Sequence, residues 1–252
     1  MTIVLSKAEA ILRAYGIDHP SQIDLEAIAY DMKATVRYQK LDGSEARIVG
    51  DGTSAIITVR EDGQRPRQRF SIAHEIGHWV DRHGRGGFVC AKEDISPQND
   101  RDRSAEAEAN AFASELILPS FLFAPMAAGL PINLDTADKI GKEFQASLTA
   151  TAIKLVKSTG KSAIVVCHSH AKRDWFVTSR GLPDGLWVAG ELNHDTDAFE
   201  LLYSPDGKGK TQVQQEAASR WFSGRDARNL KVRSQSVKIA DGVVLSMVAL
   251  FN

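Results

Sequence analysis

The stretch Arg67–Val80, RQRFSIAHEIGHWV, constrains the fold most, because its spacing predicts a helix with two different faces. Apolar residues recur on one side at helical intervals, at Ile72, Ile76, Trp79 and Val80. The other side carries His74, with Glu75 beside it, and His78. One face can therefore pack into a core, while the other either lines a site or forms a polar edge.

The polar face has the residue types of a hydrolytic metal site. Residues four apart lie on one side of a helix, so His74 and His78 can direct two imidazole nitrogens at one ion. Zinc accepts histidine nitrogen and keeps one position for a water, whose pKa it lowers from about 15.7 toward about 7. Glu75 lies about 100° round the helix from His74, where its carboxylate can accept a proton from that water. The H-E-x-x-H pattern also arises by chance, so the prediction needs a third ligand.

The sequence offers three sources for that ligand: His83, the helix predicted after Ser104, and the pair His168 and His170. His83 lies five residues after His78, so on a straight helix its side chain points about 140° away. The histidine pair lies on one side of a predicted strand, VVCHSH, where a polar strand end is the simpler interpretation.

The segment EAEANAFASELILP, residues 106–119, is the better candidate. Its small alanines allow a close approach to the first helix. Glu106 can then reach the metal, and Asn110, one turn later, can hold a histidine by its second nitrogen, a contact that metal-bound histidines usually make. The alternative for Glu106 is a first-turn carboxylate that stabilises the helix dipole, and the residues alone leave both interpretations open.

Composition restricts the class of protein. The chain has 252 residues, of which 43% are hydrophobic and 25% charged, and its net charge is -1. Such a balance is typical of a soluble globular protein without a general attraction to nucleic acid or acidic lipid. We see no signal-peptide pattern, no run of about 18 apolar residues and no disulfide framework, since the cysteines are only Cys90 and Cys167. We therefore expect a cytoplasmic protein with no membrane partner.

The pattern of elements changes near residue 160. Before it, helical segments alternate with β-branched runs such as ATVRYQKL and SAIITV, with glycines between them. After it, strand-like runs such as SAIVVCHS and VVLSMVALF are separated by Gly, Pro and Asp. We therefore predict an α+β fold, with a first domain over residues 1–160 that ends in a short helix pair, and a smaller β-rich domain over residues 161–252.

Together the two helical segments resemble the ImmA/IrrE family of zinc metallopeptidases. That family pairs an R-F-x-x-A-H-E-x-G-H helix with an E-x-x-A-N-x-F-A-x-x-L-x-x-P helix. Here the first pattern runs from Arg69 to His78 and the second from Glu106 to Pro119. The one departure is Ile117–Leu118, where many members carry Leu-Met. The resemblance covers residues 5–160.

The resemblance implies a zincin-like core, with a small antiparallel sheet and helices, and a gluzincin-like site. In such a site His74, His78 and Glu106 hold one zinc ion, Glu75 is the general base and Asn110 supports a histidine. Manganese or iron can occupy the same ligands. The family also implies an endopeptidase that cuts a helix-turn-helix repressor or an antitoxin-like protein, in a bacterial stress or mobile-element response.

An extended substrate can bind by adding a strand to an exposed sheet edge. The strongest strand pattern before the site is SAIITV. We therefore predict substrate-binding residues at Ala55, Ile56, Ile57, Thr58 and Val59.

A second hypothesis keeps the fold but not the catalysis, as a regulatory module that binds a protein partner or DNA. Its support is a locally basic stretch, residues 208–238, that includes Trp221 and Phe222. Basic residues mixed with aromatic ones can bind single-stranded nucleic acid. Acidic residues within the stretch dilute its charge, so a solvated face is the simpler interpretation and direct nucleic-acid binding is not expected. An intact Glu75 favours the enzyme, because a binding module needs no general base.

Overall fold

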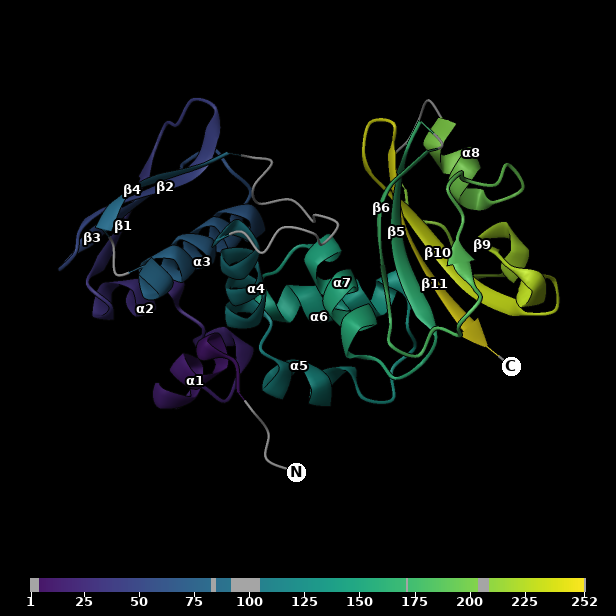
Figure 1. The fold of residues 1–252 in the computed structure, drawn as a ribbon, viewed down its shortest axis with the longest axis horizontal. Coiled ribbons are helices and arrows are strands. Elements are labelled where there is room, and N and C mark those ends of the chain that lie inside the picture. Colours follow the sequence, from purple (N-terminus) through teal and green to yellow (C-terminus); the bar gives the residue numbers. More distant parts are fainter. Residues whose placement is uncertain (1–4, 83–84, 92–104, 171, 204–208, 252) are drawn as a thin grey trace. The chain divides into compact units, whose positions relative to one another are not determined.

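The computed structural model describes residues 5–82, 85–91, 105–170, 172–203 and 209–251 (Figure 1). Its contacts divide the chain into two compact units. The first consists of Met1–Met126 and Gly141–Ser147, and the second of Ala127–Ile140 and Leu148–Asn252. The domain boundary near residue 160 stays a prediction, because the helix pair before it has residues in both units.

The first unit begins with three short helical segments: α1 (Lys7–Ala14), η1 (Pro20–Gln22) and α2 (Leu25–Asp31). Ser6 caps α1, because its side-chain oxygen accepts a hydrogen bond from the Glu9 N–H. The Glu9 carboxylate accepts the Ser6 N–H in return, which completes a capping box. Gly16 ends the segment with a φ of 69°, a left-handed conformation that costs glycine little.

Four strands form the sheet of the first unit, in the order β1-β3-β2-β4. They are β1 (Ala34–Gln39), β2 (Ser44–Asp51), β3 (Ala55–Arg60) and β4 (Arg85–Ala91). β2 and β3 form an antiparallel hairpin, with Ala46 opposite Val59. β1 runs parallel to β3, so the sheet is mixed and not the purely antiparallel sheet that the resemblance implied. The direction of a strand depends on the path of the chain between the strands, which a strand pattern alone does not specify.

Two helices of the first unit carry the polar motifs, α3 (Arg65–Arg82) and α4 (Ala105–Ile117). α3 packs on the strands β1, β2 and β3, and α4 lies beside α3 (Figure 1). Ile72 and Ile76 are completely buried, so the predicted apolar face of α3 is in the core. The Trp79 Nε1–H donates to the carbonyl of Met32 at 2.7 Å, which ties α3 to the end of α2.

A short helix, α5 (Ser120–Ala127), follows α4. The N–H of Phe121 at its start donates to the Glu9 carboxylate at 3.3 Å, so the first helix of the chain caps this one. Among the described residues no single helix is long and apolar enough to cross a membrane. α4 and α5 would pass that test only together, and they are bent by 57° at the break between them.

The predicted helix pair corresponds to α6 (Leu134–Phe144) and α7 (Leu148–Ser158). Between them Gln145 has a φ of 51°, so the chain turns sharply there. α7 packs on the first two strands of the second sheet, and its residues Ala152 and Val156 are completely buried.

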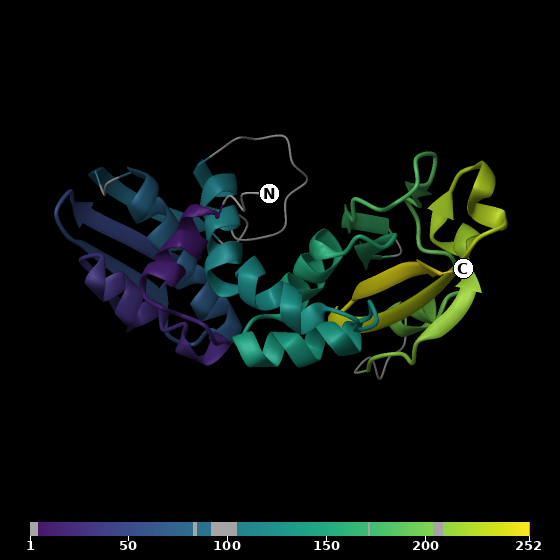
Figure 2. The same ribbon diagram turned by 90° about the horizontal axis from the view of Figure 1, so that it is seen from below.

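The second unit is built on a five-stranded antiparallel sheet in the order β6-β5-β11-β10-β8. Its strands are β5 (Ala163–Ser169), β6 (Lys172–Thr178), β8 (Gln214–Ala217), β10 (Lys231–Ala240) and β11 (Val243–Phe251). The long pair β10 and β11 is the yellow and yellow-green ribbon of Figure 2. This α+β arrangement, with a β-rich C-terminal part, is the predicted fold class.

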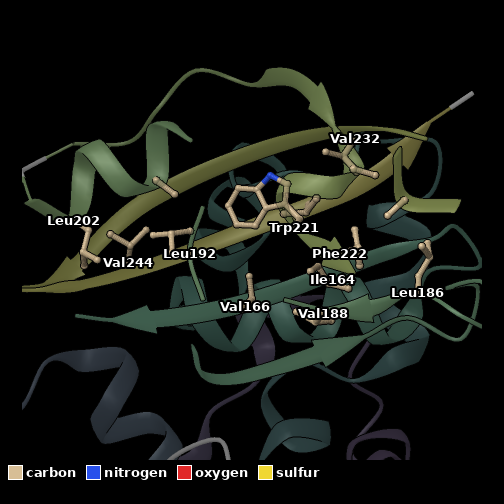
Figure 3. Close-up of a cluster of buried hydrophobic side chains, with 14 residues drawn as sticks. Ile164, Val166, Leu186, Val188, Leu192, Leu202, Trp221, Phe222, Val232 and Val244 are labelled. Atoms are coloured by element: carbon tan, nitrogen blue, oxygen red, sulfur yellow. The ribbon is translucent and has the colours of Figure 1, made fainter. Parts of the chain in front are cut away.

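Short segments complete the second unit: β7 (Trp187–Val188), α8 (Asp197–Tyr203), η2 (Ala218–Arg220), β9 (Phe222–Ser223) and η3 (Arg225–Arg228). They contribute to one hydrophobic cluster with the sheet, and Figure 3 shows Trp221 in its middle. Trp221 is 3% exposed and Phe222 is 2% exposed. The two aromatic residues of the basic stretch are therefore core residues and present no surface on which a base could stack.

Candidate metal centre

The histidines of α3 lie on its buried side that faces α4. His74 is completely buried and His78 is 3% exposed. Their Nε2 atoms lie 3.0 Å apart, because four residues make just over one helical turn and bring the two rings together. The rings meet edge to face, with centroids 4.7 Å apart. Two ligand-type nitrogens thus point at one position.

α4 supplies the third ligand-type atom, an oxygen, to the same position. Oε2 of Glu106 lies 3.1 Å from Nε2 of His74 and 3.3 Å from Nε2 of His78. Among the described residues, these three form the cluster of His, Cys, Asp or Glu side chains that can hold a metal ion. Of the candidates that the sequence left open, the α4 glutamate is therefore the one that joins the two histidines.

The spacing of the three atoms fits a small tetrahedral ion. Zinc bonds to nitrogen and oxygen are about 2.0 to 2.2 Å long, so tetrahedral ligand atoms lie about 3.3 to 3.5 Å apart. The observed separations are 3.0, 3.1 and 3.3 Å, so His74, His78 and Glu106 need to spread by only a few tenths of an ångström. Two imidazoles and one carboxylate also leave a fourth position for water or substrate.

Asn110 fixes the orientation of one imidazole. Its Oδ1 lies 3.1 Å from Nδ1 of His74, on the side of the ring away from Glu106. Phe70, which lies on α3 one turn before His74, stacks near the His74 ring, with ring centroids 6.4 Å apart. The His74 ring is thus held from two directions, with Nε2 directed at the cluster.

Electrostatics keep this imidazole neutral. Burial, and next to it the neighbouring ring of His78, lower the pKa of His74 to about 4, and the Glu106 carboxylate only partly opposes the shift. A neutral imidazole is the form that binds a metal, so His74 is ready to act as a ligand at neutral pH.

Glu75 is the remaining acidic residue of the motif. It follows His74 directly in α3 and is completely buried, so its carboxylate lies inside the protein. Burying an ionised carboxylate is costly unless it is paired and hydrogen-bonded. Glu108, by contrast, is exposed, as its position on α4 indicates.

The structure corrects one expectation about the substrate. Ala55–Val59 belongs to β3, which has β1 on one side and β2 on the other, so it is not a free sheet edge. Four of its five residues are buried, and only Ile56 is exposed. The prediction that Ala55, Ile56, Ile57, Thr58 and Val59 receive a substrate strand therefore loses its physical basis.

Sequence reasoning also missed β4. The composition of residues 84–102, rich in Gly, Asp, Asn and Pro, is typical of a loop, yet residues 85–91 form β4, which pairs with β2 along its whole length. Within the part of the chain that the structure describes, β4 has a neighbour on one side only and is therefore an edge strand. The run FVCA, which is apolar and partly β-branched, was the signal that could have indicated it.

Of the other histidine candidates, the two that the structure describes, His168 and His170, do not join the cluster. His83 lies outside the described residues. His168 is 2% exposed and lies in the core of the second unit, where its ring is 6.5 Å from that of Trp221. His170 follows in an exposed turn with a φ of 48°, so the two histidines do not converge on a common position.

The cysteine of the second unit has the properties of a core residue. Cys167 is 3% exposed, and burial, with a smaller contribution from Asp174, raises the pKa of its thiol to about 12. A thiol of this kind stays protonated and is unreactive at neutral pH.

A helix with two ligand-type histidines, facing a helix whose glutamate meets them, is the arrangement of a metallopeptidase of the H-E-x-x-H class. The family model of the IrrE N-terminal-like domain, peptidase family M78, matches residues 30–156, which is just over half of the chain. The chain therefore belongs to this family of metallopeptidases.

One solved structure resembles the chain over nearly its whole length. It is described as a Mycobacterium tuberculosis transcriptional regulator and aligns with a TM-score of 0.62 and 15% sequence identity, over 96% of this chain and 74% of the other. At that identity the likeness concerns the fold alone. No curated protein matches the sequence significantly.

Proposed function

We propose that this protein is a zinc-dependent endopeptidase that uses Glu75 as its general base. The observation that carries the proposal is the triangle of Nε2 of His74, Nε2 of His78 and Oε2 of Glu106, with sides of 3.0 to 3.3 Å. These atoms come from two helices that meet side by side. Glu75 belongs to the same helical turn as His74.

The donor set supports zinc as the metal. Histidine nitrogen together with one carboxylate oxygen suits zinc better than calcium or magnesium, which prefer oxygen ligands, although manganese and iron are compatible with it. When bound, such an ion would polarise the scissile carbonyl and lower the pKa of a water molecule.

Different side chains of the protein would bind the ion and transfer the proton. The imidazoles of His74 and His78 and the carboxylate of Glu106 would hold the ion. The Glu75 carboxylate accepts the proton of the attacking water and later delivers it to the leaving amine nitrogen. Its burial keeps bulk water away, so the proton passes between the carboxylate and the reacting atoms.

For substrate binding we propose β4 in place of β3. β4 begins three residues after α3 ends, and among the described residues only β2 pairs with it. Its outer edge can accept an extended peptide through main-chain hydrogen bonds, which require no particular side-chain sequence. An endopeptidase that binds its substrate in this way needs an extended segment, so it cuts loops or linkers more readily than packed helices.

The substrate class that we propose is a helix-turn-helix repressor or an antitoxin-like regulatory protein. Its support is the family of metallopeptidases to which the chain belongs. A bacterial stress or mobile-element response is the setting in which such a cut has an effect. The cytoplasmic location that the sequence favours is part of this proposal, and cell fractionation tests it.

The experiment is cleavage of a candidate helix-turn-helix repressor, chosen from the reading frames that neighbour this gene, by wild-type enzyme and by Glu75→Gln. The substitution preserves the size of the side chain but removes the base. We expect Glu75→Gln to retain one metal ion per chain and to lose cleavage by at least about 100-fold. A variant that still cuts at the wild-type rate would refute the role of Glu75. Full biological activity without cleavage would instead support the regulatory binding module.

A further inference from the structure

Gly77 lies where α3 and α4 come closest. A Cβ atom built on Gly77 would lie 3.2 Å from Cα of Ala109, 3.2 Å from Cδ1 of Phe112 and 3.4 Å from the carbonyl oxygen of Ala109. Carbon atoms in ordinary contact are about 3.5 to 4.0 Å apart. The space that any side chain at position 77 would need is therefore already occupied by the backbone of the neighbouring helix.

The site residues of α3 and α4 lie at the same sequence spacing from the contact between Gly77 and Ala109. His74 lies three residues before Gly77, and Glu106 lies three residues before Ala109. His78 directly follows Gly77 on α3, and Asn110 directly follows Ala109 on α4. Residues at these offsets lie within one turn of the contact point and on the side of each helix that faces the other. The distance between Gly77 and Ala109 thus controls how far apart the histidines and their α4 partners are.

We propose that Gly77 is a positioning residue for the metal ligands, and that its missing side chain sets the reach of Glu106 to His74 and His78. The inference rests on the proposed metal site. A methyl group at position 77 would push α4 outward by a few tenths of an ångström, whereas ligand distances in metal sites are held to about 0.2 Å. Glu106 is the ligand that moves, because it is the only one on α4.

The surroundings give the methyl group no easier way to fit. Two of its three close contacts would be with backbone atoms of Ala109 in the middle of α4, and these cannot rotate away. The third is the ring of Phe112, which is 7% exposed and packed in the core. The displacement therefore has to separate the helices. Helix propensity acts in the opposite direction, since alanine is a better helix former than glycine.

The test measures zinc affinity of the folded full-length protein, stripped of metal, by competition with a chromogenic chelator. The variants are Gly77→Ala and Gly160→Ala. Gly160 is the matched control, because a Cβ there would meet nothing within 4 Å. Far-UV circular dichroism and the melting temperature of the metal-free proteins show whether the fold is kept. The visible spectrum of the cobalt-loaded proteins reports the coordination of the ion, which a purely structural role would leave unchanged.

We expect Gly77→Ala to bind zinc about 10- to 100-fold more weakly than wild type, as when the support of a metal ligand is lost, and to have an altered cobalt spectrum. Gly160→Ala should match wild type in both measurements. Wild-type affinity and an unchanged spectrum in Gly77→Ala would overturn the inference, while the proposed metal site would stand. Absence of zinc binding by the wild type would refute the proposed function itself.

Phe112→Leu provides a second route if Gly77→Ala does not fold. It removes one of the three close contacts and leaves the two with the Ala109 backbone. Phe112→Leu alone is then compared with Phe112→Leu combined with Gly77→Ala. We expect the double variant to bind zinc at least about tenfold more weakly than Phe112→Leu. Equal affinities of these two proteins would overturn the inference.

Discussion

Oδ1 of Asn110 lies 3.1 Å from Nδ1 of His74, while Nε2 of the same ring lies 3.1 Å from Glu106. Because an amide oxygen only accepts hydrogen bonds, Nδ1 carries the proton and Nε2 keeps its lone pair for a metal. One residue of α4 thus selects the tautomer in which His74 can be a ligand, and another completes the ligand set.

We therefore expect Asn110→Ala to weaken zinc binding about 10- to 100-fold, because the imidazole loses the partner that fixes its tautomer and orientation. Asn110→Asp keeps an oxygen acceptor at the same place and should retain most of the affinity. Chelator competition measures both. An alanine variant that binds zinc as tightly as the wild type would contradict this role for Asn110.

The second prediction concerns acid sensitivity of the second unit. His168 is 2% exposed, and its Nδ1 has no hydrogen-bond partner among the described residues. Burial, and after it the charge of Arg173, lower the pKa of His168 to about 4, while Asp174 opposes the shift. The unfolded chain, with an ordinary histidine pKa of about 6.5, therefore binds a proton at a higher pH than the folded protein does.

Stability should consequently be highest above pH 6.5 and fall as the pH decreases from about 6.5 to about 4, by about 3 kcal/mol from this residue. His168→Gln removes the titrating group and should flatten that part of the pH profile. Urea unfolding of both proteins at a series of pH values measures the difference. Parallel profiles for wild type and variant would mean that His168 is not responsible.

A third prediction concerns nucleic acid. Trp221 and Phe222, the aromatic residues of the basic stretch, are buried in the core of the second unit (Figure 3). Trp221 also donates its Nε1–H to Glu216, which accepts Arg220 as well, so part of the local positive charge is neutralised.

We therefore expect only weak binding of a single-stranded oligonucleotide, which disappears when salt is raised from about 50 to about 200 mM. Fluorescence anisotropy of a labelled oligonucleotide measures it. Tight binding that persists at the higher salt concentration would favour the regulatory module over the peptidase.

The sequence predicted those features that depend on local spacing. The two histidines of α3 and the Glu106–Asn110 pair of α4 repeat at helical intervals, so their faces follow from the period of the helix. Ser6 indicates the start of α1 in the same way, because serine is a common N-cap residue. The structure adds Glu9, whose carboxylate completes a capping box.

Features that depend on distant pairing were not predicted. Strand order in a sheet depends on which strand edges pair, and no local sequence pattern indicated that β3 would lie between β1 and β2. The nearly continuous apolar run Ala55–Val59, interrupted only by Thr58, was the available signal, because such runs are typical of strands with neighbours on both sides. The burial of His168 likewise follows from the packing of Trp221, which lies 53 positions later in the chain.

Zinc binding by Glu106→Ala, compared with wild type and Glu75→Gln, tests the proposed centre most directly. Mass spectrometric metal analysis after loading gives the zinc content of each chain, and chelator competition gives the affinity. We expect one zinc ion in wild type and in Glu75→Gln, and at least about tenfold weaker binding in Glu106→Ala, because a catalytic zinc needs three protein ligands. Wild-type affinity in Glu106→Ala, or loss of zinc from Glu75→Gln, would contradict the assignment of three ligands and one base.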